Sequence, residues 1–449
     1  GTVTMNGAVG GTNVLGSTNI TAGAFTTGSS GTIAMGTNAL TINTDAITIG
    51  ASISGSSSSI LTIQPKTVTT TIGLGSSITS TSCGGAACAL VMDDAELGFL
   101  ADGFTSITIG STTGTGNIGI NYSAASFVFD SALVIRSASG NITATDTLDT
   151  GSNALTKTTG GAVNLAAVNS GALSVTGATI ALNNDVTTSG NQAYTGPVSL
   201  ANSITLDSGS AGAVSFASTV NSASSTARDL NITAGSGDVT FTGAVGNTYA
   251  LGAIAVDSTG TTTFGSTVNA ASVTTNTGGT TVLNGNVTTT GAQTFNDAVT
   301  LTGNVVLNAP SITTGSTLAA SSNNLTITTD ALELGGNVSG TGALVIQPKT
   351  NSTTMAIGGS ASGTLALADA ELARLTDGFS VITLGSATGT AAMSINYSSA
   401  SFVFADPLVL RSASGNITAT DALKKGDNDL TLATIGHIKI AGLNSGAIS

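Results

Sequence analysis

The sequence Arg136-Ser-Ala-Ser-Gly-Asn-Ile-Thr-Ala-Thr-Asp146 occurs twice in this chain and returns without a change as Arg411 to Asp421. The same offset, from position 136 to position 411, relates other markers that precede these two copies. The matching markers are Asp102-Gly-Phe104 and Asp377-Gly-Phe379, Asn121-Tyr122 and Asn396-Tyr397, and Ser126-Phe-Val-Phe129 and Ser401 to Phe404. A long unit is therefore repeated, and self-similarity of this kind indicates a stacked repeat architecture.

Two further repeats divide the chain. Ile63-Gln-Pro-Lys66 returns as Ile346 to Lys349 at a larger offset, so the first long unit contains eight additional residues. A shorter repeat relates Val186 to Tyr194 with Val287 to Phe295. We predict three solenoid segments: residues 1–185 with the first long unit (core at about 27–174), residues 186–310 with shorter Val- and Thr-rich coils, and residues 311–449 with a truncated second long unit.

Large apolar residues recur at short intervals between the long units. They are Phe216, Phe241, Phe264, Leu283 and Phe295, and the first four follow one another at spacings near twenty. Such spacings are typical of one coil of a β-solenoid, and only the shorter interval from Leu283 to Phe295 departs from them. Because apolar and polar residues alternate, as in 127–135, and Gly, Asn and Asp lie between such runs, we predict an all-β parallel β-helix of about 20 coils.

Composition excludes several classes of protein. Only 7% of the 449 residues are charged and 4% aromatic, but the mean hydropathy is +0.37, which argues against disorder. The formal net charge of −13 leaves no basic stripe, so we expect no nucleic-acid partner. The longest apolar run, 86–92, is too short to cross a bilayer, so we expect no transmembrane segment.

One segment departs from the strand pattern. Residues 94–104 and their copy 369–379 space apolar residues three and four apart, which predicts a small helix on the flank of the solenoid. In the first copy we expect Asp94 to be the N-cap and Gly103 the C′ residue. Asp369 and Gly378 are expected to take these roles in the second copy.

The chain has two cysteines, Cys83 and Cys88, which lie where the first long unit has its additional residues. Five positions apart in a loop with Gly and Ala, they can form a local disulfide, as exported proteins permit. A pair of free thiols is the alternative.

The module formed by Leu61 to Lys66, Asp94-Ala-Glu-Leu97, residues 102–104 and Ile107-Thr-Ile-Gly110 resembles repeats of giant bacterial exoproteins of the filamentous-haemagglutinin type. The segment 186–200 is similar to other repeats of those proteins. This resemblance implies a right-handed parallel β-helix, export to the bacterial cell surface or beyond, and adhesion or matrix building. The partners implied are a host or neighbouring-cell surface, matrix polysaccharide, or other copies of the chain, with no cofactor.

Enzymes are the main alternative, because parallel β-helices include polysaccharide lyases and hydrolases. Such enzymes need paired carboxylates, or acids with a Lys or Arg base, in a groove with aromatic walls. The densest acidic group is Asp93, Asp94 and Glu96, but Asp93 is replaced by Ala368 in the second unit. We therefore interpret the chain as a passive scaffold and not an enzyme. An ice-binding solenoid is a minor alternative, because the Thr runs are not regular from coil to coil.

Two other motifs are weaker. His437 is the only histidine, and its counterpart in the other unit is Ala162, so we expect no catalytic or metal role for it. Gly114 to Gly119 matches the dinucleotide fingerprint, but Ile118-Gly-Ile120 after it has the pattern of a strand and not of a helix. We interpret this stretch as a corner of the solenoid.

Overall fold

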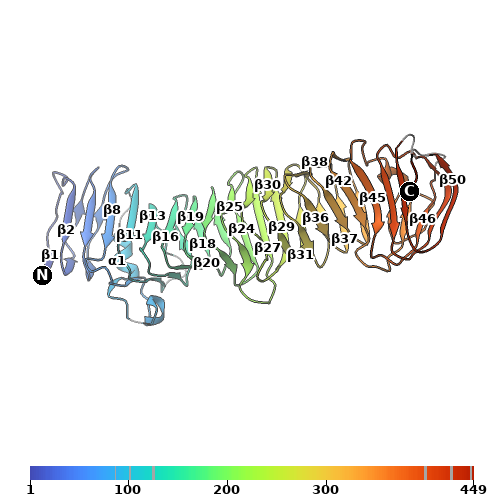
Figure 1. Ribbon diagram of the computed structural model, residues 1–449. Helices are drawn as coiled ribbons and strands as arrows, with labels where there is room; N and C mark the ends of the chain where they lie inside the picture. Colours follow the sequence, from blue (N-terminus) through green and yellow to red (C-terminus); the bar gives the residue numbers. More distant parts are fainter. Residues whose placement is uncertain (86, 101–102, 124–126, 399–401, 425–427, 445–446) are drawn as a thin grey trace. The chain divides into compact units, whose positions relative to one another are not determined.

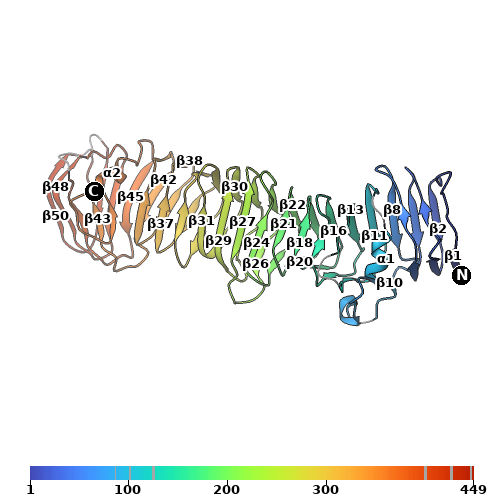
Figure 2. The ribbon, with the colours of Figure 1, turned by 180° about the vertical axis from the view of Figure 1, so that it is seen from behind.

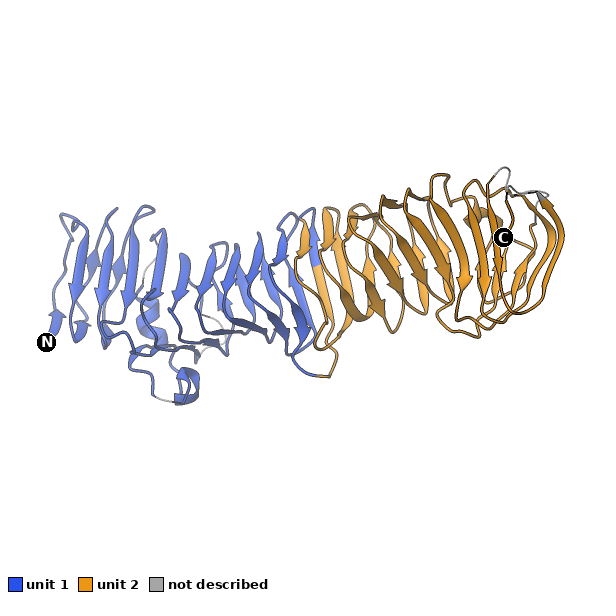
Figure 3. Cartoon of the chain, in the orientation of Figure 1, with its two compact units in different colours: residues 1–224, 233–237 blue, residues 225–232, 238–449 orange. Residues whose placement is uncertain are grey.

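A computed structural model describes residues 1–85, 87–100, 103–123, 127–398, 402–424, 428–444 and 447–449. The chain forms two compact units, shown in different colours in Figure 3: residues 1–224 with 233–237, and residues 225–232 with 238–449. The three segments inferred from the repeats are divisions of the sequence and not of these compact units, so their boundaries stay a prediction. Their markers 126 and 401 lie outside the described residues.

The chain is a mostly-β parallel β-solenoid of about 20 turns, and its described residues include two short α-helices, which confirms the predicted fold class. Figures 1 and 2 show the strands of successive turns side by side from opposite directions. Among the described residues, no helix is long and apolar enough to cross a membrane.

The first unit contains strands of several parallel sheets. Their orders are β1 (Thr2–Met5), β3 (Ala24–Thr27), β6 (Ile47–Ile49); β4 (Ile33–Ala34), β7 (Ile53–Ser54); β10 (Leu90–Met92), β9 (Ile72–Leu74), β12 (Ile118–Ile120), β14 (Ile142–Ala144), β17 (Ala162–Leu165), β20 (Thr179–Leu182), β23 (Val198–Leu200), β26 (Val220–Ser222); β2 (Thr18–Thr21), β5 (Leu40–Asn43), β8 (Ile60–Gln64), β11 (Ser106–Gly110), β13 (Ala132–Arg136), β16 (Leu155–Thr158), β19 (Leu173–Thr176), β22 (Gln192–Thr195), β25 (Val214–Phe216); and β15 (Leu148–Asp149), β18 (Val168–Ser170), β21 (Val186–Thr188), β24 (Ile204–Asp207).

The second unit is built in the same way. Its orders are β28 (Val239–Phe241), β30 (Thr261–Phe264), β32 (Thr280–Leu283), β35 (Ala298–Leu301), β38 (Leu318–Ser321), β41 (Val338–Gly340); β29 (Leu251–Ser258), β31 (Val268–Thr275), β33 (Val287–Thr289), β34 (Gln293–Phe295), β36 (Val305–Asn308), β37 (Ser311–Thr314), β39 (Leu325–Thr328), β40 (Ala331–Leu334), β42 (Ala343–Gln347), β45 (Val381–Ser386), β47 (Leu408–Ser412), β49 (Leu430–Ala433); and β44 (Leu365–Leu367), β43 (Met355–Ile357), β46 (Met393–Ile395), β48 (Ile417–Lys424), β50 (Ile438–Asn444). Strand β27 (Leu230–Gly235) has residues in both units.

Columns of aliphatic side chains form the core of each unit. Leu133 pairs with Leu155, and Leu155 pairs with Leu173, so each leucine stacks on the leucine of the next coil. All three leucines are almost completely buried. On each strand, the residues that alternate with the buried positions face outward. Burial of each leucine stabilises the fold by at most about 3 kcal/mol. The period-two alternation thus directs the side chains of paired positions in neighbouring coils to the same face of the sheet.

The short interval between Leu283 and Phe295 has a simple structural cause. Phe264 pairs with Phe241 on one side and with Leu283 on the other, and Leu283 pairs with Leu301. Phe295 lies in a different sheet, where it is paired with neither Leu283 nor Leu301. The regular coil step after Leu283 therefore leads to Leu301.

Asparagine side chains bridge successive coils at one corner of the first unit. Asn117 Oδ1 accepts a hydrogen bond of 2.8 Å from the main-chain N–H of Asn141. Asn141 Oδ1 in turn accepts one of 2.9 Å from the N–H of Ala162. Main-chain amides that the sheets leave unpaired at a corner are thereby satisfied.

The shorter repeat places a glutamine inside each unit. Gln192 is completely buried, its Nε2 donates to the carbonyl oxygen of Asp207 at 2.8 Å, and its Oε1 accepts from the hydroxyl of Tyr194 at 2.9 Å. Gln293 is also completely buried, but Phe295 occupies the place of the tyrosine. Gln293 Oε1 accordingly has no hydrogen-bond partner among the described residues.

The substitution Tyr194→Phe tests this difference. It removes the donor to Gln192 Oε1 and leaves a buried acceptor unpaired, so we expect it to lower the free energy of unfolding by about 1–3 kcal/mol. Tyr122→Phe is the matched control, because the buried hydroxyl of Tyr122 has no partner in the described part of the chain. That control is expected to leave stability unchanged or higher in a urea titration. Equal losses in the two variants would contradict the assignment.

A lysine lies inside the first unit. Lys157 is completely buried between Ile135 and Val175, and its Nζ has no hydrogen-bond partner among the described residues. Burial lowers the pKa of Lys157 to about 7, because the apolar column disfavours the charged amine. The corresponding residue of the second unit is Leu432.

We expect Lys157→Leu to raise the free energy of unfolding by up to about 4 kcal/mol at neutral pH, from the value of about 1.4 kcal/mol per pKa unit. Between pH 7 and pH 10.5 the unfolded chain holds a proton that the buried amine lacks, so the stability of the unmodified protein rises with pH in this window. The gain from the substitution should shrink across the same window, as measured by denaturant titrations at several pH values. Lys66→Leu, at an exposed position, should show no such trend.

Candidate functional site

The two short helices carry the densest acidic groups of the described residues. Helix α1 spans Asp94–Gly98, and its N-cap is Asp93, whose Oδ1 accepts from the N–H of Glu96 at 2.8 Å. Glu96 Oε2 accepts from the N–H of Asp93 at 2.9 Å, which completes a capping box. The prediction that Asp94 is the N-cap was therefore wrong by one position. Asp93 offers the same side chain one position earlier.

The second helix, α2 (Asp369–Leu372), has the N-cap Ala368, which has no side-chain acceptor. Asp369 is thus the first helical residue and not the predicted N-cap. Glu371 Oε2 still accepts from the N–H of Ala368 at 2.9 Å. Half of the capping box is retained in the second unit.

The predicted ends of both helices were also wrong. Helix α1 has the C-cap Phe99 in the right-handed helical region, so Gly103 is not its C′ residue. In the second unit the C-cap is Ala373, and Gly378 lies further along the chain. The helices stop early because the chain returns to β pairing, with a bridge between Ile53 and Leu100 in the first unit. Gly103 and Gly378 have φ values of +108° and +131° and serve the turns before the next strands.

Asp94 joins two loops that are distant in sequence. Its Oδ1 accepts from the N–H of Ser76 at 2.9 Å, and its Oδ2 accepts from the N–H of Ser123 at 2.9 Å and from the Ser123 hydroxyl. Asp369 accepts in the same way from the N–H groups of Gly359 and Ser398, at 2.8 and 2.9 Å. Partial burial opposes ionisation of Asp94, but the hydrogen bonds from Ser123 and Ser76 outweigh it and lower its pKa.

The glutamates attach each helix to an earlier strand. Glu96 Oε1 accepts from the N–H of Ile49 in β6 at 2.9 Å, and Glu371 Oε1 accepts from the N–H of Leu334 in β40 at 3.2 Å. Burial raises the pKa of Glu371. These carboxylates and those of the two aspartates accept hydrogen bonds from main-chain amides, so their charge stabilises loops. In the described part of the chain, no group of three or more His, Cys, Asp or Glu residues is suited to a metal ion.

The additional residues of the first unit form a disulfide-bonded loop. Cys83 and Cys88 are joined by a disulfide next to the short 3-10 helix η1 (Ser80–Cys83). Cys83 is buried and its Sγ lies 3.2 Å from the carbonyl oxygen of Ile72 in β9. The disulfide closes a small loop against one strand and spans no coils.

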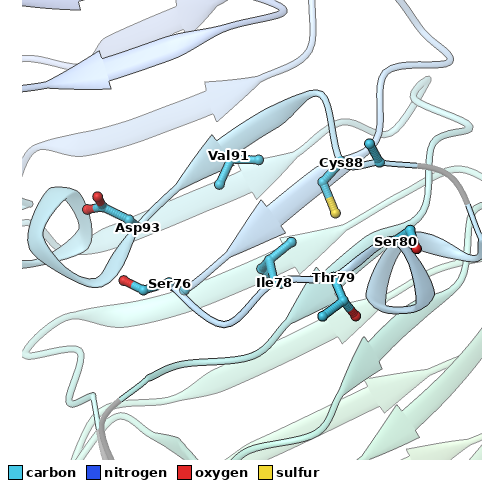
Figure 4. Close-up of a pocket in the computed structure, with 9 residues that line it drawn as sticks. Ser76, Ile78, Thr79, Ser80, Cys88, Val91 and Asp93 are labelled. Atoms are coloured by element: carbon cyan, nitrogen blue, oxygen red, sulfur yellow. The ribbon is translucent and has the colours of Figure 1, made fainter.

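This loop borders a surface pocket of about 350 Å³. Figure 4 shows polar side chains at its two ends, Asp93 and Ser76 at one and Ser80 at the other. Ile78 and Val91 lie between them and provide an apolar surface. One carboxylate, hydroxyl groups and an apolar floor can together hold a small polar molecule.

Only the first long unit has the sequence that lines this pocket. The second unit lacks the eight additional residues and has Gly359 in place of Ser76 and Ala368 in place of Asp93. The two units share the carboxylates that hold the helices and differ in the residues that line the pocket. Surface loops of repeat proteins are where such local differences are tolerated.

The remaining sequence motifs occupy ordinary positions. His437 is exposed and precedes β50, and its main-chain N–H donates to Asn416 Oδ1 at 2.9 Å. Residues 118–120 form strand β12, as expected for a solenoid corner followed by a strand. Sequence reasoning missed the buried Lys157, although its counterpart Leu432 was a signal that the position faces the core.

Comparison of the chain with protein-family models, with curated proteins and with solved structures found no match.

The two aspartates of the first helix are expected to differ in importance. Asp94→Ala removes two amide hydrogen bonds and a hydroxyl hydrogen bond, so we expect it to destabilise the loops of Ser76 and Ser123 by about 2 kcal/mol or more. Asp93→Ala should have an effect of about 1 kcal/mol or less, since α2 has alanine at this position. Native-state hydrogen exchange of the Ser76 and Ser123 amides measures both effects. Faster exchange in Asp93→Ala than in Asp94→Ala would contradict the structural role of Asp94.

Proposed function

We propose that this chain is an extracellular structural and adhesive β-solenoid of a bacterium, a passive scaffold built from repeats. The observation that carries the proposal is the use of its carboxylates. Asp94, Glu96 and their counterparts in the second unit accept hydrogen bonds from main-chain amides and hold loops against the coils. A scaffold needs such fixed loops, whereas a glycosidase uses its carboxylates on a substrate.

The surface chemistry supports a place outside the cell. The disulfide between Cys83 and Cys88 is typical of oxidising compartments. Few charges and many small polar side chains on regular strands suit a long-lived surface protein, because stacked coils protect the backbone. The resemblance to filamentous-haemagglutinin-type exoproteins supports the same location. Its partners would be a cell surface, matrix polysaccharide or other copies of the chain.

Excision of one long unit tests the scaffold role. Removal of residues 137–411 joins Arg136 to Ser412, and the two serines at this place make the same contacts. Ser137 Oγ donates to the carbonyl oxygen of Gly114 at 2.9 Å, and Ser412 Oγ to that of Gly389 at 2.9 Å. The shortened chain should therefore keep its register, its β circular dichroism and its export.

The matched control removes residues 143–418 and joins Ile142 to Ala419 inside a strand. Because this junction slips the alternation by one position, inward and outward side chains exchange and the chain should be destabilised. Adhesion of cells that display the in-register chain should weaken by degrees and not vanish. Loss of a polysaccharide-cleaving activity on excision would overturn the scaffold role. Recovery of the native protein from the cytosol, as judged by antibody labelling of intact cells and fractionation, would overturn the proposed location.

A further inference from the structure

A second recess, of about 450 Å³, lies on the outer surface of the first unit. It is lined by Arg136 at the end of β13 and Thr158 at the end of β16, which pair with each other in neighbouring coils. Thr112, in the loop after β11, lies at its border, and Val134 and Ala138 contribute apolar surface. These strands are adjacent in Figure 1. We refer to this site as the Arg136 recess.

Among the described residues that line the recess, Arg136 alone is charged. Its side chain is half-buried, and its Nε is buried without a hydrogen-bond partner in the described part of the chain. In the second unit the counterpart Arg411 donates from Nε to the carbonyl oxygen of Gly385 at 3.3 Å. Because this Nε has almost no accessible surface, an acceptor in the recess would meet the terminal N–H groups of the half-buried guanidinium.

Two hydroxyl groups accompany the arginine. Thr112 and Thr158 are exposed, and both line the recess. Their counterparts in the second unit are Ala387 and Ala433. The first unit therefore combines an arginine with two hydroxyl donors, whereas the second unit retains the arginine without them.

We propose that the Arg136 recess binds a uronic acid residue of a saccharide through its carboxylate. A guanidinium presents parallel N–H donors that match the two oxygens of a carboxylate. In this assignment the hydroxyls of Thr112 and Thr158 would bond ring hydroxyls, and Val134 and Ala138 would contact the carbon face of the ring. The volume exceeds that of a bare anion and is in the range of sites for small ligands.

The net charge of the whole chain further restricts the class of ligand that the recess can bind. With a formal net charge of −13, the chain repels densely charged polyanions. A saccharide with one carboxylate among several hydroxyl groups avoids this repulsion and still uses the single arginine. This inference goes beyond the proposed scaffold role and does not rest on it, because the site is defined by its own residues.

Titration of the full chain with glucuronate, glucose and acetate, monitored by isothermal calorimetry, tests the inference. Glucuronate should bind at least tenfold more tightly than glucose, which lacks the carboxylate, and than acetate, which lacks the ring hydroxyls. A uronate-containing oligosaccharide distinguishes a residue within a polymer from the free sugar acid, and it should bind at least as tightly as glucuronate. Equal binding of acetate and glucuronate would overturn the assignment to a sugar.

Arg136→Gln should weaken glucuronate binding at least tenfold, and the matched variant Arg411→Gln should leave it unchanged. The double variant Thr112→Ala, Thr158→Ala gives the first unit the residues of the second at these places, so it should fold normally and bind at least threefold more weakly. Circular dichroism and thermal unfolding serve as folding controls. Unchanged affinity in Arg136→Gln, or an equal loss in Arg411→Gln, would overturn the site.

Discussion

The parallel hydrogen-bonded ladder between successive coils is the constraint on which the rest of this structure depends. Each strand pairs with its counterpart one coil away, as Leu133 does with Leu155, so a side chain that faces inward must find an inward-facing neighbour above and below. Aliphatic residues satisfy this condition most simply, because identical shapes stack without voids. Polar corners such as the asparagines 117 and 141 then bond the amides that the ladder leaves unpaired.

Gln192, Gln293 and Lys157 interrupt the aliphatic columns, and they differ in how well their hydrogen-bonding groups are satisfied. Gln192 is accepted in the core because its amide donates to main-chain carbonyls and Tyr194 donates to its oxygen. Gln293 also donates from its amide to main-chain carbonyls, but it lacks the tyrosine donor. The Nζ of Lys157 has no hydrogen-bond partner among the described residues. These groups lower stability locally. A solenoid withstands them because its stability is a sum of coil and interface contributions, most of which are unaffected.

The fold was predictable because the spacing of apolar residues along the chain determines which residues pair in successive coils. Recurrence at spacings near twenty and period-two alternation are local patterns, and they imply stacked coils without knowledge of any distant contact. The helix caps were not predictable to the exact position, because the choice between Asp93 and Asp94 depends on the positions of Ser76 and Ser123. The short interval before Phe295 could not be explained from the sequence either, because only the structure shows that this residue lies in another sheet.

Duplication separates the two kinds of constraint in this chain. Asp94, which holds two loops in the first long unit, keeps this role as Asp369 in the second. The pocket beside the disulfide and the Arg136 recess are both built from outward-facing or inserted residues, several of which the second unit replaces. The side chains at such positions lie outside the buried columns, so they can change without loss of the fold. The surface chemistry of one unit can therefore change while its copy keeps the same fold.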